Sequence, residues 1–572
     1  MNSAFFLVLR RMRAPIILLI VIYAVAILGL TLVPGVDADG KPTPPLSFFH
    51  AFYFISYTAT TIGFGEIPNA FSEAQRLWVT ICIYLTVVGW SYSVVTLIGL
   101  LQDKGFQNTL TVNRFRRRIL HLEEPFYLIC GCGETGNLIC RTLDRLGHAF
   151  VVLEKDELRV QELDLQDFKT DTPALAADAR QPDNLLLAGL QHPKCRAVLA
   201  VTNDEECNLA IAIAARLLNP DVAVIGRCHS ESVAANMASF GTDHIINPFA
   251  RFAEHLALAV GAPERFRLVE LLTALPETPL PEPHRPPAGN WILCGYGRFG
   301  HLLVDHLRPA GIELTIIDPD CDPTCAPSTI RGYGTEAATL RQAGIESAVG
   351  IVAGSDNDVN NLSIAVTASE LKPTLFVVAR QNHSANSLLF ETYDADFTMV
   401  PGRIVAQECI AILTTPLLAA FLNLLRQQDE VWSAALGKRL QELNDGLTPV
   451  IWGIKLNIAE AQGAYRALMS GERITLGAIL RDGTDRSQPL AAIVLLVRRH
   501  RQDFLLPDDD LLLHAGDQLL LASTSAARRN FELTLHNPNE LDYVLTGQEV
   551  SGSWLWDYWL ARNKAANNTR NA

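Results

Sequence analysis

The chain has 572 residues, of which 49% are hydrophobic and 19% charged, and its formal net charge is −14 at pH 7. A domain usually takes about 100–200 residues, so this length predicts three or four domains. The acidic balance excludes nucleic acid as an expected partner, because binding a polyanion needs a basic surface. The eleven cysteines include no CxxC pair. Most of them lie in apolar segments, which indicates reduced packing thiols and excludes a disulfide framework.

Two uncharged segments, residues 15–33 and 77–101, are long enough to cross a membrane. A bilayer core of roughly 30 Å needs about 20 apolar residues of helix, so we expect spans at about 15–34 and 76–102. Basic residues precede the first span and follow the second, whereas only two lie between them. The positive-inside rule therefore predicts that both termini lie in the cytoplasm. We expect the chain in the inner or plasma membrane.

Residues 46–60, between the spans, are apolar and aromatic but too short to cross, which suits a re-entrant helix lining a cavity. A glycine-containing segment follows directly, and with it we expect a pore helix and filter over residues 46–66. Glycines at alternate positions allow dihedrals that turn consecutive carbonyls toward one axis, as an ion-binding ring requires. An ordinary glycine-rich turn is the alternative. The segment consists of Thr61, Ile62, Gly63, Phe64 and Gly65.

This order of span, short helix, glycine segment and span resembles the two-transmembrane class of potassium-channel subunits. The resemblance implies that residues 1–112 form a pore domain and that residues 61–65 are a selectivity filter holding potassium ions. It also implies a homotetramer in contact with membrane lipid, since one chain supplies one filter strand. Gly89, in the second span, is a candidate gating hinge, with close helix packing as the equal alternative.

Further along the chain, a glycine-rich motif occurs twice, at an offset of 164 positions. Each copy follows an apolar strand, opens a helix and precedes by eighteen residues an acid that ends the next strand. Such a loop lets the backbone and the helix N-terminus approach a pyrophosphate, and the acid binds ribose hydroxyls. We therefore expect NAD or an adenine nucleotide. The residues are Gly131, Gly133, Gly136 and Glu154 in the first copy, and Gly295, Gly297, Gly300 and Asp318 in the second.

The two copies differ in the charge beside the expected phosphate position. Glu134 places a negative charge there in the first copy, whereas Arg298 stands at the matching place in the second. We therefore favour the second copy for nucleotide binding. Either loop has an alternative role, which is to pack strand against helix and hold nothing. Further matches at an offset of 153, such as Arg227 with Arg380, support a duplicated domain.

Duplicated nucleotide folds behind a two-span pore resemble RCK domains, the regulators of potassium conductance. The resemblance implies a cytoplasmic gating ring that pulls on the second span through the connector at residues 102–118. The fold class that we expect is multi-domain, with an α-helical two-transmembrane pore, two α/β Rossmann-like RCK domains and a small α+β C-terminal subdomain. The expected boundaries are 120–275 for the first RCK domain with its dimerisation helices, 276–290 for a proline-rich linker, 291–430 for the second RCK domain, 431–545 for the C-terminal subdomain and 546–572 for a tail.

The function that follows is a ligand-gated potassium channel with a small-molecule effector of NAD, ADP or AMP type. Calcium is a second candidate effector, because the three aspartates at residues 508–510 could bind it, and Glu277 and Glu282 are separate candidates. A solvated turn is the alternative for the aspartates. We see no catalytic His/Asp or Cys/His pattern and expect no enzyme. The alternatives are a membrane-tethered NAD-dependent oxidoreductase and a regulatory subunit of a potassium transporter, and neither explains the filter.

Overall fold

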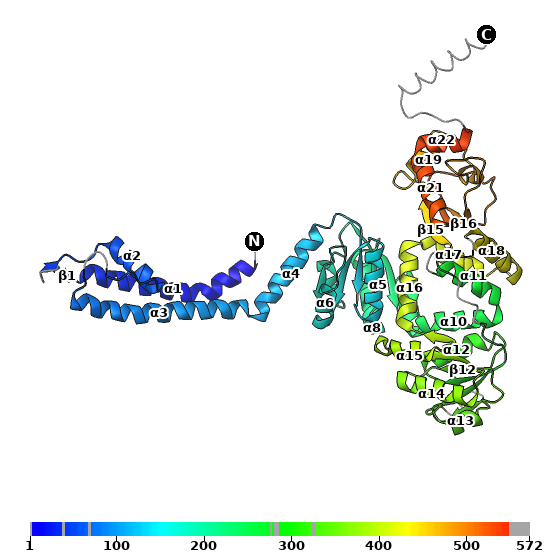
Figure 1. Cartoon of the computed structure of the whole chain (residues 1–572), viewed down its shortest axis with the longest axis horizontal. Helices are drawn as coiled ribbons and strands as arrows, with labels where there is room; N and C mark the ends of the chain where they lie inside the picture. Colours follow the sequence, from blue (N-terminus) through cyan, green and yellow to red (C-terminus); the bar gives the residue numbers. More distant parts are fainter. Residues whose placement is uncertain are drawn as a thin grey trace, which may run out of the picture. The chain divides into compact units, whose positions relative to one another are not determined.

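The computed structural model describes residues 3–36, 41–66, 70–274, 277–279, 285–321, 328–444, 446–500 and 502–547 (Figure 1). The chain forms two compact units, Met1–Leu122 and Glu123–Ala572. Glu282 and residues 548–572 of the expected tail lie outside the described residues.

Within the described part of the first unit, two helices are long and apolar enough to cross a membrane. They are α1 (Ser3–Leu32) and α3 (Glu73–Leu101), which overlap most of the expected spans and lie side by side (Figure 1). Gly29 lets them approach, because a Cβ there would stand 2.0 Å from Cε2 of Trp78. The Trp78 indole also donates to the carbonyl of Ala26 at 3.2 Å. A small residue at the contact is typical of packing between membrane helices.

The helix α2 (Phe48–Ala59) lies between the two spans in sequence and packs on α1. Its 12 residues give a length of about 18 Å, too short for a bilayer core of about 30 Å. Ser47 caps its N-terminus. The helix buries Phe54 and Ile55 against α1 and against Phe71 of the following loop. A further helix, α4 (Lys104–Leu120), follows α3 and covers most of the expected connector.

The second unit begins with two six-stranded parallel sheets of the same strand order. Each has the order 3-2-1-4-5-6, which is that of dinucleotide-binding folds, and this confirms the two Rossmann-like domains. The first sheet has the order β5-β4-β3-β6-β7-β8 and the second β11-β10-β9-β12-β13-β14. The strands are β3 (Phe126–Cys130), β4 (Ala149–Glu154), β5 (Ala174–Ala176), β6 (Cys195–Ala200), β7 (Ala223–Arg227), β8 (His244–Ile246), β9 (Asn290–Cys294), β10 (Glu313–Asp318), β11 (Thr329–Arg331), β12 (Gly350–Ala353), β13 (Phe376–Arg380) and β14 (Phe397–Met399).

Helices connect these parallel strands, as crossover connections require. In the first copy they are α5 (Glu134–Arg145), α6 (Glu157–Asp164), α7 (Pro182–Leu187), α8 (Glu205–Leu218) and α9 (Glu231–Ser239). In the second they are α12 (Arg298–Leu307), α13 (Ala337–Gln342), α14 (Asp358–Leu371), the 3₁₀ helix Ser384–Asn386 and α15 (Ser387–Tyr393).

The two copies exchange a helix. The helix α10 (Pro248–Gly261) follows the last strand of the first copy and packs on α12 of the second, while α16 (Pro401–Thr414) follows the second copy and packs on α5 of the first (Figure 1). Phe252 of α10 joins Leu303 of α12 in one buried cluster. Cys409 of α16 likewise joins Leu143 of α5. Each copy therefore completes the core of the other, so the two fold as one body.

A four-stranded antiparallel sheet of order β15-β18-β16-β17 closes the second unit and confirms the small α+β subdomain. One face packs on α19 to α22, and the other packs on α11, α17 and α18. Part of the expected linker joins this subdomain, since Pro279 pairs with Leu447. The elements are α11 (Pro263–Thr273), α17 (Pro416–Leu425), α18 (Glu430–Leu443), β15 (Val450–Lys455), α19 (Gln462–Met469), α20 (Leu476–Ile479), β16 (Ala492–Arg499), β17 (Gln502–Leu505), β18 (Gln518–Ser523), α21 (Ser525–His536) and α22 (Pro538–Thr546).

Candidate pore and nucleotide sites

In the segment after α2, residues with a left-handed backbone alternate with residues outside the left-handed region. Thr61, Gly63 and Gly65 have φ values of 64°, 65° and 94°, whereas Ile62 and Phe64 between them stay outside the left-handed region. This alternation turns successive carbonyls to one side, as a ring of carbonyls around an ion requires. Glycine takes such a φ without strain, but a left-handed residue with a side chain costs roughly 1–2 kcal/mol. Thr61 must therefore be held by its surroundings.

Tyr57 of α2 holds this segment at both ends. Its hydroxyl donates to the carbonyl of Gly65 at 2.6 Å. Its own carbonyl accepts from the N–H of Ile62 at 2.9 Å and from that of Gly63 at 3.3 Å. Its ring, buried with 4% exposed, meets the ring of Phe64 edge-on at 5.4 Å. Tyr57 cannot be identified from the sequence, since nothing in the spacing singles out one aromatic residue among the many in α2.

Replacing Tyr57 by phenylalanine is expected to shorten the lifetime of the conducting filter. The change removes one hydrogen bond, worth about 0.5–1.5 kcal/mol, and leaves the ring contacts in place. In sustained recordings, we expect the current to decay at least about threefold faster, because each chain of the assembly loses the same bond. Tyr53→Phe is the control, because the Tyr53 side chain is 45% exposed and lies one turn earlier on the same helix. Equal decay in the two variants would contradict the role of Tyr57.

The end of the segment at residues 61–65 is tied to the start of α3. The carboxylate of Glu66 accepts from Nε of Arg76 at 2.8 Å and from Nη2 of Arg76 at 3.1 Å. It also accepts from the N–H of Phe71 at 3.0 Å. A two-pronged contact of this kind fixes geometry as well as charge. The segment is thus fastened to α2 on one side and to α3 on the other.

Gly89 lies within α3, which runs unbroken from Glu73 to Leu101. A Cβ at Gly89 would stand 2.7 Å from Cδ1 of Ile22 in α1, so the glycine serves close packing of the two spans. The hinge role stays a prediction.

The two glycine loops share one geometry. Gly131 and Gly295 open the turns with φ values of 97° and 100°. A Cβ at Gly136 would stand 2.0 Å from the carbonyl oxygen of Gly131, and a Cβ at Gly300 would stand 2.2 Å from that of Gly295. Real Cβ atoms do not approach so closely, so only glycine fits the third position of either motif. This close strand–helix contact is the role of the third glycine in a dinucleotide-binding loop.

The second glycine of each motif begins a helix. Gly133 is the N-cap of α5 and Gly297 that of α12, and neither helix receives a side-chain cap. Since the first N–H groups of a helix have no partner within it, both ends are suited to an anion.

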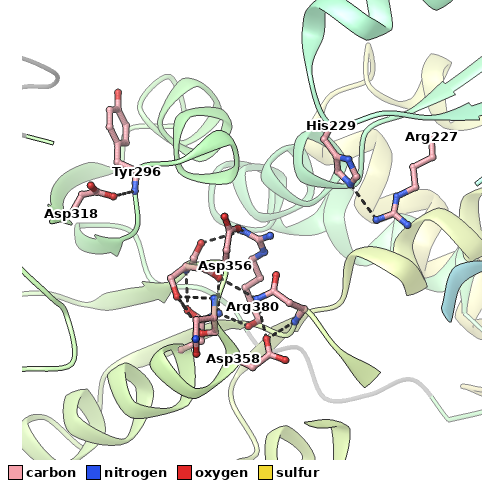
Figure 2. Close-up of polar contacts among 12 residues, drawn as sticks. Arg227, His229, Tyr296, Asp318, Asp356, Asp358 and Arg380 are labelled. Carbon is pink, nitrogen blue, oxygen red and sulfur yellow. Dashed lines mark hydrogen bonds and ion pairs between the residues drawn. The ribbon is translucent and has the colours of Figure 1, made fainter. Parts of the chain in front are cut away.

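The two motif acids make the same contacts with their own loops. One oxygen of Glu154 accepts from the N–H of Cys132 and the other from that of Asp156. One oxygen of Asp318 accepts from the N–H of Tyr296 at 2.7 Å (Figure 2). The other accepts from the N–H groups of Asp320 at 2.9 Å and Cys321 at 3.1 Å. A carboxylate has about four acceptor positions, so both acids can still accept from a hydroxyl.

The charged residues that distinguish the loops both reach across to the other copy. Glu134 accepts from the N–H and the hydroxyl of Ser384, each at 2.7 Å. Nη1 of Arg298 lies 3.5 Å from Oε1 of Glu205. At the first loop, Nη1 of Arg159 lies close to Gly133, because a Cβ added to that glycine would stand 3.2 Å from it. Each loop therefore has one nearby arginine, and the charge difference that favours the second copy is smaller than the sequence suggests.

Two buried arginines, 153 positions apart, lie beside the loops (Figure 2). Arg227 donates to the hydroxyl of Thr135 at 3.1 Å and to Nε2 of His229 at 3.1 Å. Burial lowers the pKa of Arg227, and burial together with the nearby arginines lowers the pKa of His229 to about 4. His229 is therefore neutral at pH 7 and accepts the hydrogen bond. The offset of 153 already pairs the two arginines in the sequence, but the offset does not show that they lie beside the loops.

Arg380, the counterpart of Arg227, has different surroundings. It pairs with Asp356 at 2.8 Å and faces the rings of Phe249 and Phe299, whose centroids lie 4.6 and 5.4 Å away. Burial lowers the pKa of Arg380 as well, although Asp356 opposes the shift. The side chains around Arg227 are thus polar, whereas Arg380 is surrounded by one aspartate and two aromatic rings.

The described residues contain no cluster of metal-ligating side chains that would support the calcium prediction. Among the residues that the structure describes, no group of three or more His, Cys, Asp or Glu side chains could hold a metal ion. Glu277 accepts from the N–H of Ser525 at 3.3 Å.

Comparisons with known proteins match two kinds of domain to this chain. Residues 16–103 match the ion-channel domain family, and residues 127–248 and 291–401 match the TrkA-N domain family. The potassium channel protein 1 of Methanocaldococcus jannaschii is 25% identical over 231 residues, which cover 40% of this chain and 67% of that protein. The voltage-gated potassium channel Kch of Escherichia coli is 24% identical over 221 residues, covering 38% of this chain and 51% of that protein.

A third relative is an uncharacterised protein of Methanothermus fervidus, 28% identical over 228 residues that cover 40% of this chain and 35% of that protein. The chain thus spans between about a third and two thirds of the length of these relatives. Among solved structures, the GsuK channel bound to NAD is 17% identical and covers 93% of this chain and 100% of that chain, with a TM-score of 0.45.

Proposed function

We propose that this chain, which joins an ion-channel domain to two TrkA-N domains, is a potassium channel controlled by a cytoplasmic nucleotide. The observation that carries the proposal is the alternating backbone at Thr61, Gly63 and Gly65 between two membrane-length helices. Such a backbone lines up carbonyl oxygens that replace the hydration shell of an ion. Because one chain supplies one such strand, four chains form the pore.

The effector that we propose is NAD or an adenine nucleotide. Two loops with tight glycine turns, uncapped helix ends and a carboxylate at the end of the next strand support it. The helix α4 follows α3 after only Gln102 and Asp103, and it is the route by which the nucleotide-binding domains act on the pore. A ligand can shift this equilibrium only by binding one state of the domains more tightly than the other.

The chain lies in the inner or plasma membrane with both ends in the cytoplasm. Arg10, Arg11 and Arg13 near the start of α1 and the basic residues of α4 support this orientation.

Planar-bilayer recordings with potassium on one side and sodium on the other test the pore. The purified full-length chain should give a current whose reversal potential lies close to the value for potassium alone. A current that does not discriminate between the two ions, or no current either with or without NAD and ADP, would contradict the proposal.

Calorimetric titration of the same protein with NAD and ADP tests the effector. Heat of binding with either nucleotide supports this part of the proposal, and no heat with both rejects it.

A further inference from the structure

The second glycine loop faces a residue of the first copy. Arg298 is the first residue of α12, and its Nη1 lies 3.5 Å from Oε1 of Glu205, the first residue of α8. The Arg298 side chain is 63% exposed and that of Glu205 is 19% exposed. The arginine is therefore free to move, whereas the glutamate is held in place.

Three hydrogen bonds fix the carboxylate of Glu205. The N–H groups of His229 and Ser230 donate to it at 2.8 and 2.9 Å, and the Ser230 hydroxyl donates at 3.2 Å. Partial burial by itself would raise the pKa of Glu205, but these hydrogen bonds lower it below the ordinary value. Glu205 is therefore ionised at neutral pH and presents a fixed negative charge to Arg298.

A phosphate at the second loop would need the same guanidinium. The uncapped N-terminus of α12 attracts an anion, and Arg298 is an exposed cationic side chain at that end of the helix, whereas the nearby Arg380 is buried and paired with Asp356. Glu205 attracts this guanidinium and repels a phosphate. We propose that Glu205 is an internal competitor, so that the phosphate of a nucleotide bound at the second loop takes Arg298 from Glu205 and breaks this bridge between the two copies. The inference rests on the proposed nucleotide site.

The first loop lacks this exchange. At the matching position Glu134 accepts from Ser384 of the second copy, so the bridge there consists of a carboxylate and neutral donors. A phosphate at the first loop has no cation to take from that bridge. Of the two loops, only the second therefore releases a contact between the copies when it binds a nucleotide.

Replacing Glu205 by glutamine separates charge from hydrogen bonding. The glutamine oxygen still accepts from the N–H groups of His229 and Ser230, but the competing charge is gone. An exposed ion pair is worth up to about 1 kcal/mol, so we expect ADP and NAD to bind about threefold to fivefold more tightly. Glu206→Gln is the matched control, because Glu206 is the next residue, is exposed and carries the same charge.

The experiment is calorimetric titration of the full-length chain with ADP, NAD and adenosine. Glu205→Gln should tighten binding of ADP and NAD but not of adenosine, which has no phosphate, and Glu206→Gln should change none of them. In an Arg298→Gln background, the Glu205→Gln change should lose its effect. Equal affinities in the Glu205 and Glu206 variants, or a gain that persists without Arg298, would overturn the exchange. No nucleotide binding by the unaltered chain would instead reject the proposed effector, and the exchange with it.

Discussion

Replacing Gly63 by alanine is expected to abolish potassium-selective current. Gly63 has a φ of 65°, and a Cβ there would meet no atom of its own chain within 4 Å. The penalty is therefore conformational, at roughly 1–2 kcal/mol for each left-handed residue with a side chain. In the proposed ring of four chains the change occurs four times, which amounts to about 4–8 kcal/mol against the proposed conducting backbone. Recordings with potassium opposite sodium should show no current or no discrimination between the ions.

Gly99→Ala is the control for this experiment. Gly99 lies in α3, and a Cβ there also meets nothing within 4 Å, but its backbone is helical. Alanine suits a helix better than glycine does, so the variant should conduct as the unaltered chain does. If Gly63→Ala and Gly99→Ala were equally selective, residues 61–65 would not be the filter.

Replacing Gly300 by alanine is expected to weaken nucleotide binding at the second loop about tenfold or more. The added Cβ would stand 2.2 Å from the carbonyl oxygen of Gly295, so the loop must open. Overpacking of this kind typically costs 1–3 kcal/mol, and here it displaces the N–H groups that face the phosphate. Calorimetric titration of the full-length variant with NAD and ADP measures the loss.

Gly136→Ala makes the equivalent change in the first loop, where the Cβ would stand 2.0 Å from the carbonyl oxygen of Gly131. The pair of variants assigns each binding event to a loop. Gly437→Ala, in the open surroundings of α18, controls for the mere addition of a methyl group and should bind as the unaltered chain does. Full-strength binding in a variant altered at both Gly136 and Gly300 would remove both loops as nucleotide sites.

The features that the sequence predicts well depend on local pattern. The long uncharged runs correspond to α1 and α3, since length and hydrophobicity alone define a membrane-crossing helix. The two glycine loops follow strands and open helices because turn, strand and helix signals lie within a few residues of one another. The same motifs predict a Rossmann-like fold, and each sheet has the strand order of that fold.

The features that the sequence leaves open depend on contacts between distant residues. Tyr57 reaches the carbonyl of Gly65 because α2 ends at Ala59 and the chain turns back there. The spacing of aromatic residues in the sequence does not reveal this contact. Arg298 meets Glu205, 93 positions away in sequence, only because α10 and α16 cross between the two copies. The sequence favours the second loop as the nucleotide site because of the charges of Glu134 and Arg298. In the structure, both of these side chains have partners in the other copy.

The most direct test of the central proposal is the potassium current through the purified full-length chain, with NAD or ADP added to each side of a planar bilayer in turn. We predict a potassium-selective current that changes when the nucleotide reaches the cytoplasmic side and does not change when it reaches the other. The absence of a potassium-selective current, or a current that is indifferent to nucleotide on both sides, would contradict the proposal.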